Sequence, residues 1–302
     1  MEKQQRNKPI LKNEISFILM HLVPLGMIWT GATTFDWIIC ASLYFARMFF
    51  VTAGYHRYFA HKTYSTSRVF QFILAFLAET SAQKGALWWA AHHRIHHRYS
   101  DLPEDPHSAK LYGFWYSHIG WIMGPDYKET EYKYIKDLAA YKELNWLNKH
   151  YLVPPVILAI CVFFAGAFFN SEPGNFNINN GWSTLIIGFF TSTLILYHRT
   201  FSINSLMHMI GKPRYESGDK SKNSFILALV TLGEGWHNNH HYYMDTVRQG
   251  FYWWELDITF YVLKIFSWFG LIWNLKPVPK YIKDSRNKEE AKQLKEELQS
   301  NK

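Results

Sequence analysis

Apolar residues are concentrated in four long stretches that carry few or no charges. They cover residues 15–35, 37–54, 151–170 and 182–198. A very short turn joins the first two and one short polar loop joins the last two, so the pattern predicts two helical hairpins. About 20 apolar residues are enough to cross a bilayer core of about 30 Å. We therefore expect an all-α integral membrane protein with four transmembrane helices.

The alternative is a large soluble protein whose apolar stretches are buried core helices. One isolated stretch would fit that reading equally well, whereas four stretches in paired hairpins favour the membrane. No cleavable signal peptide is expected, because the first stretch is too long and leads directly into the second.

The basic residues predict the orientation. Four of them precede the first stretch: Lys3, Arg6, Lys8 and Lys12. The hairpin loops, residues 31–36 and 171–181, contain no lysine or arginine. By the positive-inside rule, both termini and the long middle segment face the cytoplasm, as in a multi-pass protein of a bacterial inner membrane.

The remaining chain forms a cytoplasmic cap from residues 55–150 and 199–283. The cap and the spans make one domain, residues 1–283, followed by a charged helical tail, 284–302. Residues 68–91 read as a helix too polar to span, and residues 251–275 as an aromatic-rich stretch at the headgroup level.

Composition narrows the chemistry. The formal charge of +8 could indicate nucleic-acid binding, but the positive-inside pattern and attraction to anionic membrane lipids explain it better. We expect no nucleic-acid partner. The only two cysteines, Cys40 and Cys161, lie inside predicted spans, so no disulfide is expected. With 15 histidines present, metal chemistry would use imidazole.

The histidines cluster on the side assigned to the cytoplasm. Nine of them recur at short spacings: His56 and His61; His93, His96 and His97; His208, four residues after Asn204; and His237, His240 and His241. Positions i, i+3 and i+4 share a helix face, so each triplet can direct its nitrogens toward one centre. The isolated histidines, His21, His118, His150 and His198, are interpreted as packing or interfacial residues.

Nine imidazoles are too many for one metal and suit two. Imidazole accepts zinc, copper, iron or nickel, so the ligand type does not select the metal. A structural zinc site would be closed by four ligands, and this set is larger and lies next to the membrane surface. Two redox metals with neutral ligands would favour dioxygen chemistry on a molecule reached from the bilayer.

The chain resembles the membrane-bound fatty acyl desaturases, in particular the delta-9 acyl-CoA and acyl-lipid branch, from about residue 15 to residue 279. The resemblance rests on Gly-Tyr-His-Arg-Tyr-Phe-Ala-His (54–61), His-Arg-Ile-His-His-Arg-Tyr-Ser-Asp (93–101), Asp-Pro-His-Ser (105–108), Ser-His-Ile-Gly-Trp (117–121), Asn-Ser-Leu-Met-His (204–208) and Gly-Glu-Gly-Trp-His-Asn-Asn-His-His (233–241). Arg-Gln-Gly-Phe-Tyr-Trp-Trp-Glu (248–255) looks like the bacterial and cyanobacterial members.

The resemblance implies a helical cap with two non-haem Fe2+ ions above four spanning helices. One iron would take His56, His93, His97 and His240, with Asn204 acting through a water. The other would take His61, His96, His208, His237 and His241. With O2 as co-substrate and two electrons, such enzymes remove two hydrogens from an acyl chain and leave a cis double bond.

The resemblance also suggests residues around the metal ligands. Trp121, Thr200 and Phe201 would line a tunnel for the acyl chain, with Gln83 and Trp89 near its mouth. Ordinary aromatic packing is an equally good reading of each residue taken singly. Glu234 and His107 would orient the ligand imidazoles from behind.

Three departures from the family leave the substrate open. Ala91-His92 and Pro125-Asp126 stand where acyl-CoA members carry basic residues for the CoA moiety, so the acyl carrier can be a membrane lipid or CoA. Tyr44 and Arg47 fall where the family closes the tunnel, which suggests a shorter or displaced chain. Arg47 lies within a span and is expected to face the bundle interior.

No fused electron-transfer module is recognised, so a separate ferredoxin or cytochrome b5-type protein with its reductase would supply electrons. Two other functions stay open. A di-iron hydroxylase or ketolase could use a similar histidine set, although the Asn-Ser-x-x-His element favours desaturation. A metal transporter would place its ligands at mid-bilayer, whereas these histidines lie outside the spans.

Overall fold

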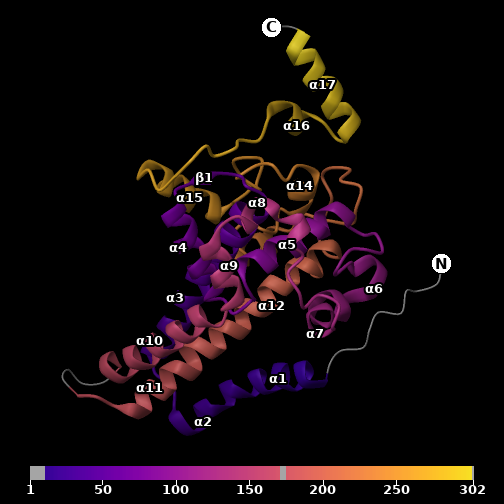
Figure 1. Cartoon of the computed structure of the whole chain (residues 1–302). Helices are drawn as coiled ribbons and strands as arrows, with labels where there is room; N and C mark the ends of the chain where they lie inside the picture. The colour runs from indigo at the N-terminus through magenta and orange to yellow at the C-terminus, as the bar shows by residue number, and fades with distance from the viewer. Residues whose placement is uncertain (1–10, 171–174, 301–302) are drawn as a thin grey trace.

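The computed structural model describes residues 11–170 and 175–300, with side chains from residue 15, and is almost entirely helical (Figure 1). This confirms the helical class. The described residues contain a single two-stranded sheet, in which β1 (Ser65–Thr66) pairs antiparallel with β2 (Ile272–Trp273). A bundle of α3, α10, α11 and α12 occupies one end of the molecule, and the cap occupies the other.

The four apolar stretches are all helical, with breaks that the sequence did not reveal. The elements that cover these stretches and their ends are α1 (Leu11–Leu22), η1 (Val23–Gly26), α2 (Met27–Thr30), α3 (Thr34–Phe50), η2 (Val51–Ala60), α10 (Val153–Phe169), α11 (Ile178–Thr184), η5 (Leu185–Thr191) and α12 (Ser192–Asn204). Among the described residues, Thr34–Ala60 is long and apolar enough to cross a membrane by itself. Lys142–Lys149 with Val153–Phe169 could supply a second crossing as a pair bent by 66°. The count of four spans stays a prediction.

The cap is built from short helices that lie between the two hairpins in the sequence and after the second hairpin. They are α4 (Arg68–Glu79), α5 (Ala86–Tyr99), α6 (Ala109–Trp115), η3 (Tyr116–Gly120), α7 (Trp121–Met123), η4 (Tyr132–Tyr134), α8 (Lys136–Ala139), α9 (Lys142–Lys149), η6 (Leu206–His208), α13 (Phe225–Val230), α14 (His237–Tyr242), α15 (Ile258–Trp268) and α16 (Lys280–Asp284). The tail forms a separate helix, α17 (Lys288–Ser300). In Figure 1, α17 projects beyond the cap, away from the bundle.

The single helix expected over residues 68–91 is wrong, because the chain breaks between α4 and α5. Ala82 and Lys84 adopt φ values of 57° and 64°, which an α-helix cannot contain. The carboxylate of Glu79 accepts a hydrogen bond from the backbone N–H of Ala86 at 2.9 Å. Glu79 therefore satisfies a free donor at the start of α5 and holds the two helices at this turn.

Two buried charged groups tie the bundle together. Asp36, fully buried on α3, accepts hydrogen bonds from the hydroxyls of Ser183 and Thr184 and from the amide of Asn170. Asp36 also completes a capping box with Thr33 at the start of α3. The polar residues of the second hairpin thus satisfy a carboxylate of the first.

Arg47 faces the bundle interior, as expected. Its guanidinium donates to Thr193 Oγ1 at 2.7 Å, to the hydroxyl of Ser192, and to backbone carbonyls that include that of Thr80 at 3.4 Å. Neutral oxygens from α3, the turn after α4 and the second hairpin therefore satisfy the buried cation.

The Asp36 network predicts a stability change. In Asp36→Ala, the hydroxyls of Ser183 and Thr184 and the Asn170 amide lose their acceptor in a buried site. We expect the free energy of unfolding to fall by about 2 kcal/mol, measured by unfolding in detergent. Asn179→Ala, an exposed residue at the same end of the bundle, should leave it unchanged. Equal stability of the two variants would contradict this role for Asp36.

Candidate metal centre and adjoining cavity

Five imidazoles, which we call the first group, converge in the cap: His56, His61, His93, His97 and His240. One nitrogen of each ring lies within 4.8 Å of those of all the others. The Nε2 atom of His240 is 3.0 Å from that of His56 and 2.9 Å from that of His97. Five nitrogens that face one point cannot all hydrogen-bond to one another, so the arrangement fits a central cation.

A π-helical segment brings His56 and His61 into this group. The segment η2 ends at Ala60, and the N–H of His61 bonds back to the carbonyl of His56 at 3.2 Å. This i to i+5 bond places residues five apart on one side, and the two ring centroids are 4.8 Å apart. The structure therefore groups His61 with His56, whereas the resemblance had assigned it to the other metal.

Four further imidazoles form the second group: His96, His208, His237 and His241. The Nε2 atoms of His208 and His237 are 3.1 Å apart, and those of His96 and His241 are 3.4 Å apart. The group combines residues of α5, η6 and α14. Ring centroids of His97 and His241, one from each group, are 4.5 Å apart, so the two groups are neighbours.

The helical triplets divide between the groups and do not each serve one centre. In α5, His93 and His97 belong to the first group and His96 to the second. In α14, His240 joins the first group, and His237 and His241 join the second. The expectation of one centre per triplet differs from the structure because side chains at the two edges of one helix face can point to two adjacent centres.

Three buried carboxylates contact the Nδ1 atoms of imidazoles in the two groups. Asp105 Oδ1 is 2.9 Å from Nδ1 of His96, and Asp219 Oδ2 is 2.6 Å from Nδ1 of His241. Glu234 Oε2 is 2.5 Å from Nδ1 of His56. Each contact fixes the ring so that its Nε2 faces the group, which is the usual arrangement behind metal-bound histidine.

Burial and the crowding of rings favour neutral imidazoles. Burial and neighbouring histidines lower the pKa of His93, His97 and His240 well below 6.5. Burial also acts to lower the pKa of His96, but Asp105 outweighs it and raises that pKa. Most rings are therefore available as neutral ligands near neutral pH.

Glu234 stays ionised because Arg57 and His56 lie against its carboxylate. Burial alone would raise its pKa, but His56 and Arg57 lower it to about 2. The Nη2 atom of Arg57 is 3.0 Å from Glu234 and 2.9 Å from Asp257. Gly233, at φ 124°, makes this approach possible, because a Cβ atom there would collide with the Asp257 carboxylate.

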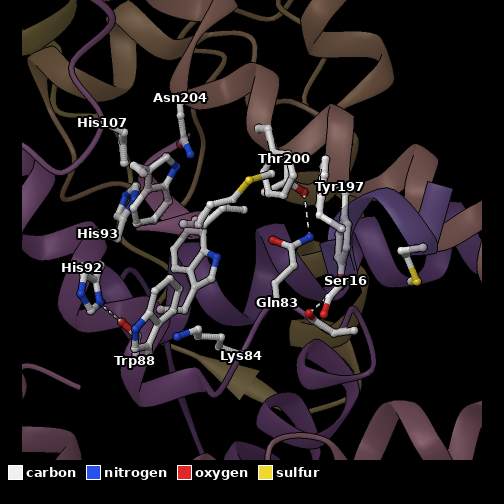
Figure 2. Close-up of a pocket in the computed structure, with 18 residues that line it drawn as sticks. Ser16, Gln83, Lys84, Trp88, His92, His93, His107, Tyr197, Thr200 and Asn204 are labelled. Carbon is white, nitrogen blue, oxygen red and sulfur yellow. Dashed lines mark hydrogen bonds between the residues drawn. The ribbon is translucent and has the colours of Figure 1, made fainter. Parts of the chain in front are cut away.

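A cavity of about 370 Å³ adjoins the first group (Figure 2). All five residues expected to line a tunnel lie on its wall: Gln83, Trp89, Trp121, Thr200 and Phe201. His93, His107 and Asn204 gather at one side of it, and Ser16 and Tyr197 lie at the other. The structure thus joins the expected tunnel residues to the histidine groups in one space.

Specific contacts shape this cavity. The Gln83 amide donates to Thr200 Oγ1 at 3.0 Å, which links the turn after α4 to α12 across the cavity wall (Figure 2). Trp89 stacks on the ring of His93, with centroids 4.8 Å apart. The ring of His107 lies 4.3 Å from that of His96, which agrees with a position behind a ligand.

Some residues of the site were not anticipated. Asp105 belongs to the recognised Asp-Pro-His-Ser motif, so its place beside His107 was a usable signal. Asp219 lies in a loop with no motif, and its contact with His241 depends on the tertiary fold. Gln249 Nε2, 3.1 Å from His56 Nδ1, was also missed, although it lies within the matched 248–255 segment.

The carboxylates of the second group lead to a prediction about metal affinity. Asp105→Asn and Asp219→Asn each replace a charged acceptor behind a ring, so the ring is held less firmly and is less basic. We expect about tenfold weaker binding of Fe2+ to the second group, measured by competition with a chelator and by metal content. Glu104→Gln, an exposed neighbour, is the matched control. Unchanged affinity in both Asp variants would rule out this role.

Comparisons with known proteins agree with this site. The chain matches the fatty acid desaturase family over residues 33–274. It is 32% identical over 228 residues to an sn-1 stearoyl-lipid 9-desaturase of Anabaena variabilis, covering 75% of this chain and 78% of that protein. It is 31% identical over 280 residues to an sn-2 palmitoyl-lipid 9-desaturase of Nostoc sp. (strain 36), covering 89% and 91%.

A relative named for a different activity is about as similar. The hex-5-enoyl-[acyl-carrier protein] acetylenase of Moorena producens is 31% identical over 307 residues, covering 93% of this chain and 94% of that protein. The family match covers most of the chain and includes every histidine of both groups. The chain therefore belongs to the fatty acid desaturase family, on the delta-9 branch, and is an oxidoreductase that acts on acyl chains.

Proposed function

We propose that this protein inserts a cis double bond at the delta-9 position of a saturated acyl chain, with two non-haem irons and O2. The observation that supports this best is an apolar cavity that reaches the first imidazole group at His93, with the second group next to the first. The first group and Asn204, acting through a water, would hold one iron, and the second group the other. Iron bound there would supply the power to oxidise C–H bonds that no acid or base can activate.

The chain's own residues would position the substrate. We expect the Gln83–Thr200 hydrogen bond, which crosses the cavity wall, and the Trp89 ring, which stacks on His93, to bend an extended chain. Trp121, stacked on Trp88 with centroids 5.9 Å apart, forms a further part of the wall. A fixed bend selects which pair of methylenes lies beside the first group, and the apolar wall excludes water from it.

We propose a membrane lipid as the acyl carrier. The positions at which acyl-CoA members carry cations are Ala91-His92 and Pro125-Asp126 here, and the two relatives described first are named as lipid-linked desaturases. Ser16, Phe17 and Met20 of α1 form one wall of the cavity, while Ile15, Ile18 and Leu19 of the same helix are exposed. A lipid chain in the bilayer would thus lie one helix away from the cavity.

The proposed topology follows the sequence. Four spans in two hairpins would place both termini and the cap in the cytoplasm of a bacterial cell, with the protein in the inner membrane. A ferredoxin or cytochrome b5-type protein with its reductase would supply the electrons. Hydroxylated or ketone products would support the alternative di-iron chemistry, and metal uptake without an oxidised product would support a transporter.

Expression in a bacterial host with a defined lipid profile tests the function. We expect a new cis-9 unsaturated acyl chain in membrane lipids, located by mass spectrometry of double-bond derivatives. His97→Ala and His240→Ala should return the host profile, because each removes a nitrogen from the first group. His150→Ala, at an exposed position in the cap, should retain full activity. Normal product from both first-group variants would refute the site.

The Gln83–Thr200 bond leads to a separate prediction. Thr200→Val keeps the side-chain shape but removes the hydroxyl that accepts from Gln83. We expect about tenfold lower turnover and a mixture of double-bond positions, because the bend is held less firmly. Thr200→Ser keeps the hydroxyl and should keep the regiochemistry of the parent protein. Identical product patterns in both variants would show that this bond does not set the bend.

A further inference from the structure

A basic hollow lies on the cap beside the second histidine motif. Arg94, Arg98, Lys133 and Tyr134 line it. Lys62 and Lys136 flank it, because the carboxylate of Asp137 pairs with both Lys62 (2.5 Å) and Arg94 (2.7 Å) and follows Lys136 in α8. We call this surface the Tyr134 patch, made of Lys62, Arg94, Arg98, Lys133, Tyr134 and Lys136.

The patch concentrates positive charge around one aromatic ring. The guanidinium carbon of Arg98 and Nζ of Lys133 lie 5.4 Å and 5.2 Å from the centroid of Tyr134. Five cations face two carboxylates, Asp137 and Glu131, which leaves an excess of positive charge. Within residues 11–170 and 175–300, neither Arg98 nor Lys136 has a carboxylate at salt-bridge distance.

The patch lies on the same backbone segments as the first group. Arg94 and Arg98 each directly follow a first-group histidine in α5, and Lys62 directly follows His61. The guanidinium of Arg94 donates to the carbonyls of Phe59 and Ala60 at 2.8 Å and 2.9 Å, on the segment that carries His56. The patch is therefore attached to both backbone segments that present the first group.

We propose that the Tyr134 patch is the docking surface for a small, acidic electron-transfer protein. The inference rests on the proposed function, in which R–CH2–CH2–R′ + O2 + 2 e− + 2 H+ gives R–CH=CH–R′ + 2 H2O. Because each turnover consumes two electrons, a one-electron carrier must dock two times per turnover. Such exchange requires a weak, rapidly dissociating interface. Opposite charge accelerates such encounters, and the half-buried ring of Tyr134 among these cations gives the interface a packing contact.

Binding tests the patch without turnover. The probe is an oxidised acidic [2Fe–2S] ferredoxin, titrated into the full-length protein in nanodiscs. In Arg98→Glu/Lys133→Glu we expect the Kd to rise by about tenfold at low ionic strength, with the difference lost in high salt. The matched control, Lys288→Glu/Lys292→Glu, makes the same charge change on α17, which projects away from the cap (Figure 1). A control Kd that rises equally, or no binding by the unsubstituted protein, overturns the proposal.

Turnover with two donors separates this proposal from the proposed function. Dithionite-reduced methyl viologen is too small to need a docking surface, so the Arg98→Glu/Lys133→Glu variant should keep its viologen-driven rate and lose its ferredoxin-driven rate. An equal loss with both donors would overturn the docking role. If the unsubstituted protein desaturates with neither donor, the proposed function fails, and the binding result alone decides whether the patch docks an acidic carrier.

Discussion

The convergence of nine buried imidazoles is the constraint on which the rest of the cap depends. Each ring removed from water must have its nitrogens satisfied, or its burial costs free energy. Asp105, Asp219 and Glu234 meet this need for His96, His241 and His56 from three different segments, and Arg57 in turn balances Glu234. The loops of the cap are therefore held by the same contacts that aim the rings, so the centre and its scaffold form one unit.

Sequence reasoning was successful where the chemistry is local. The helical spacing predicted that His93, His96 and His97 lie on one helix, as they do in α5. The resemblance also named five residues that line a single cavity in the structure. It failed where backbone geometry or distant contacts decide. Nothing in residues 54–61 distinguishes an α-turn from a π-turn, so the sequence did not show that the rings of His56 and His61 lie side by side. Asp219 reaches His241 only through the tertiary fold.

The hydropathy pattern was incomplete for a physical reason. The second hairpin carries polar residues that face inward, not outward: Ser183 and Thr184 bind Asp36, and Ser192 and Thr193 bind Arg47. These hydroxyls dilute the mean hydropathy of the helix Ile178–Asn204 while they satisfy charges from α3. An average over the sequence counts these hydroxyls as polar and lowers the predicted membrane propensity. In the fold they lie inside the bundle and satisfy the buried charges of Asp36 and Arg47.

The π-helical segment η2 has a consequence for how such a centre can change. A π-helical turn contains one more residue than an α-helical turn. The number of residues in η2 therefore determines which side of the helix each histidine ring faces. Deleting one residue between His56 and His61 would restore α-helical spacing and rotate all that follows, up to the turn at Lys62. The metal-facing geometry therefore constrains the number of residues in this segment as well as their identity.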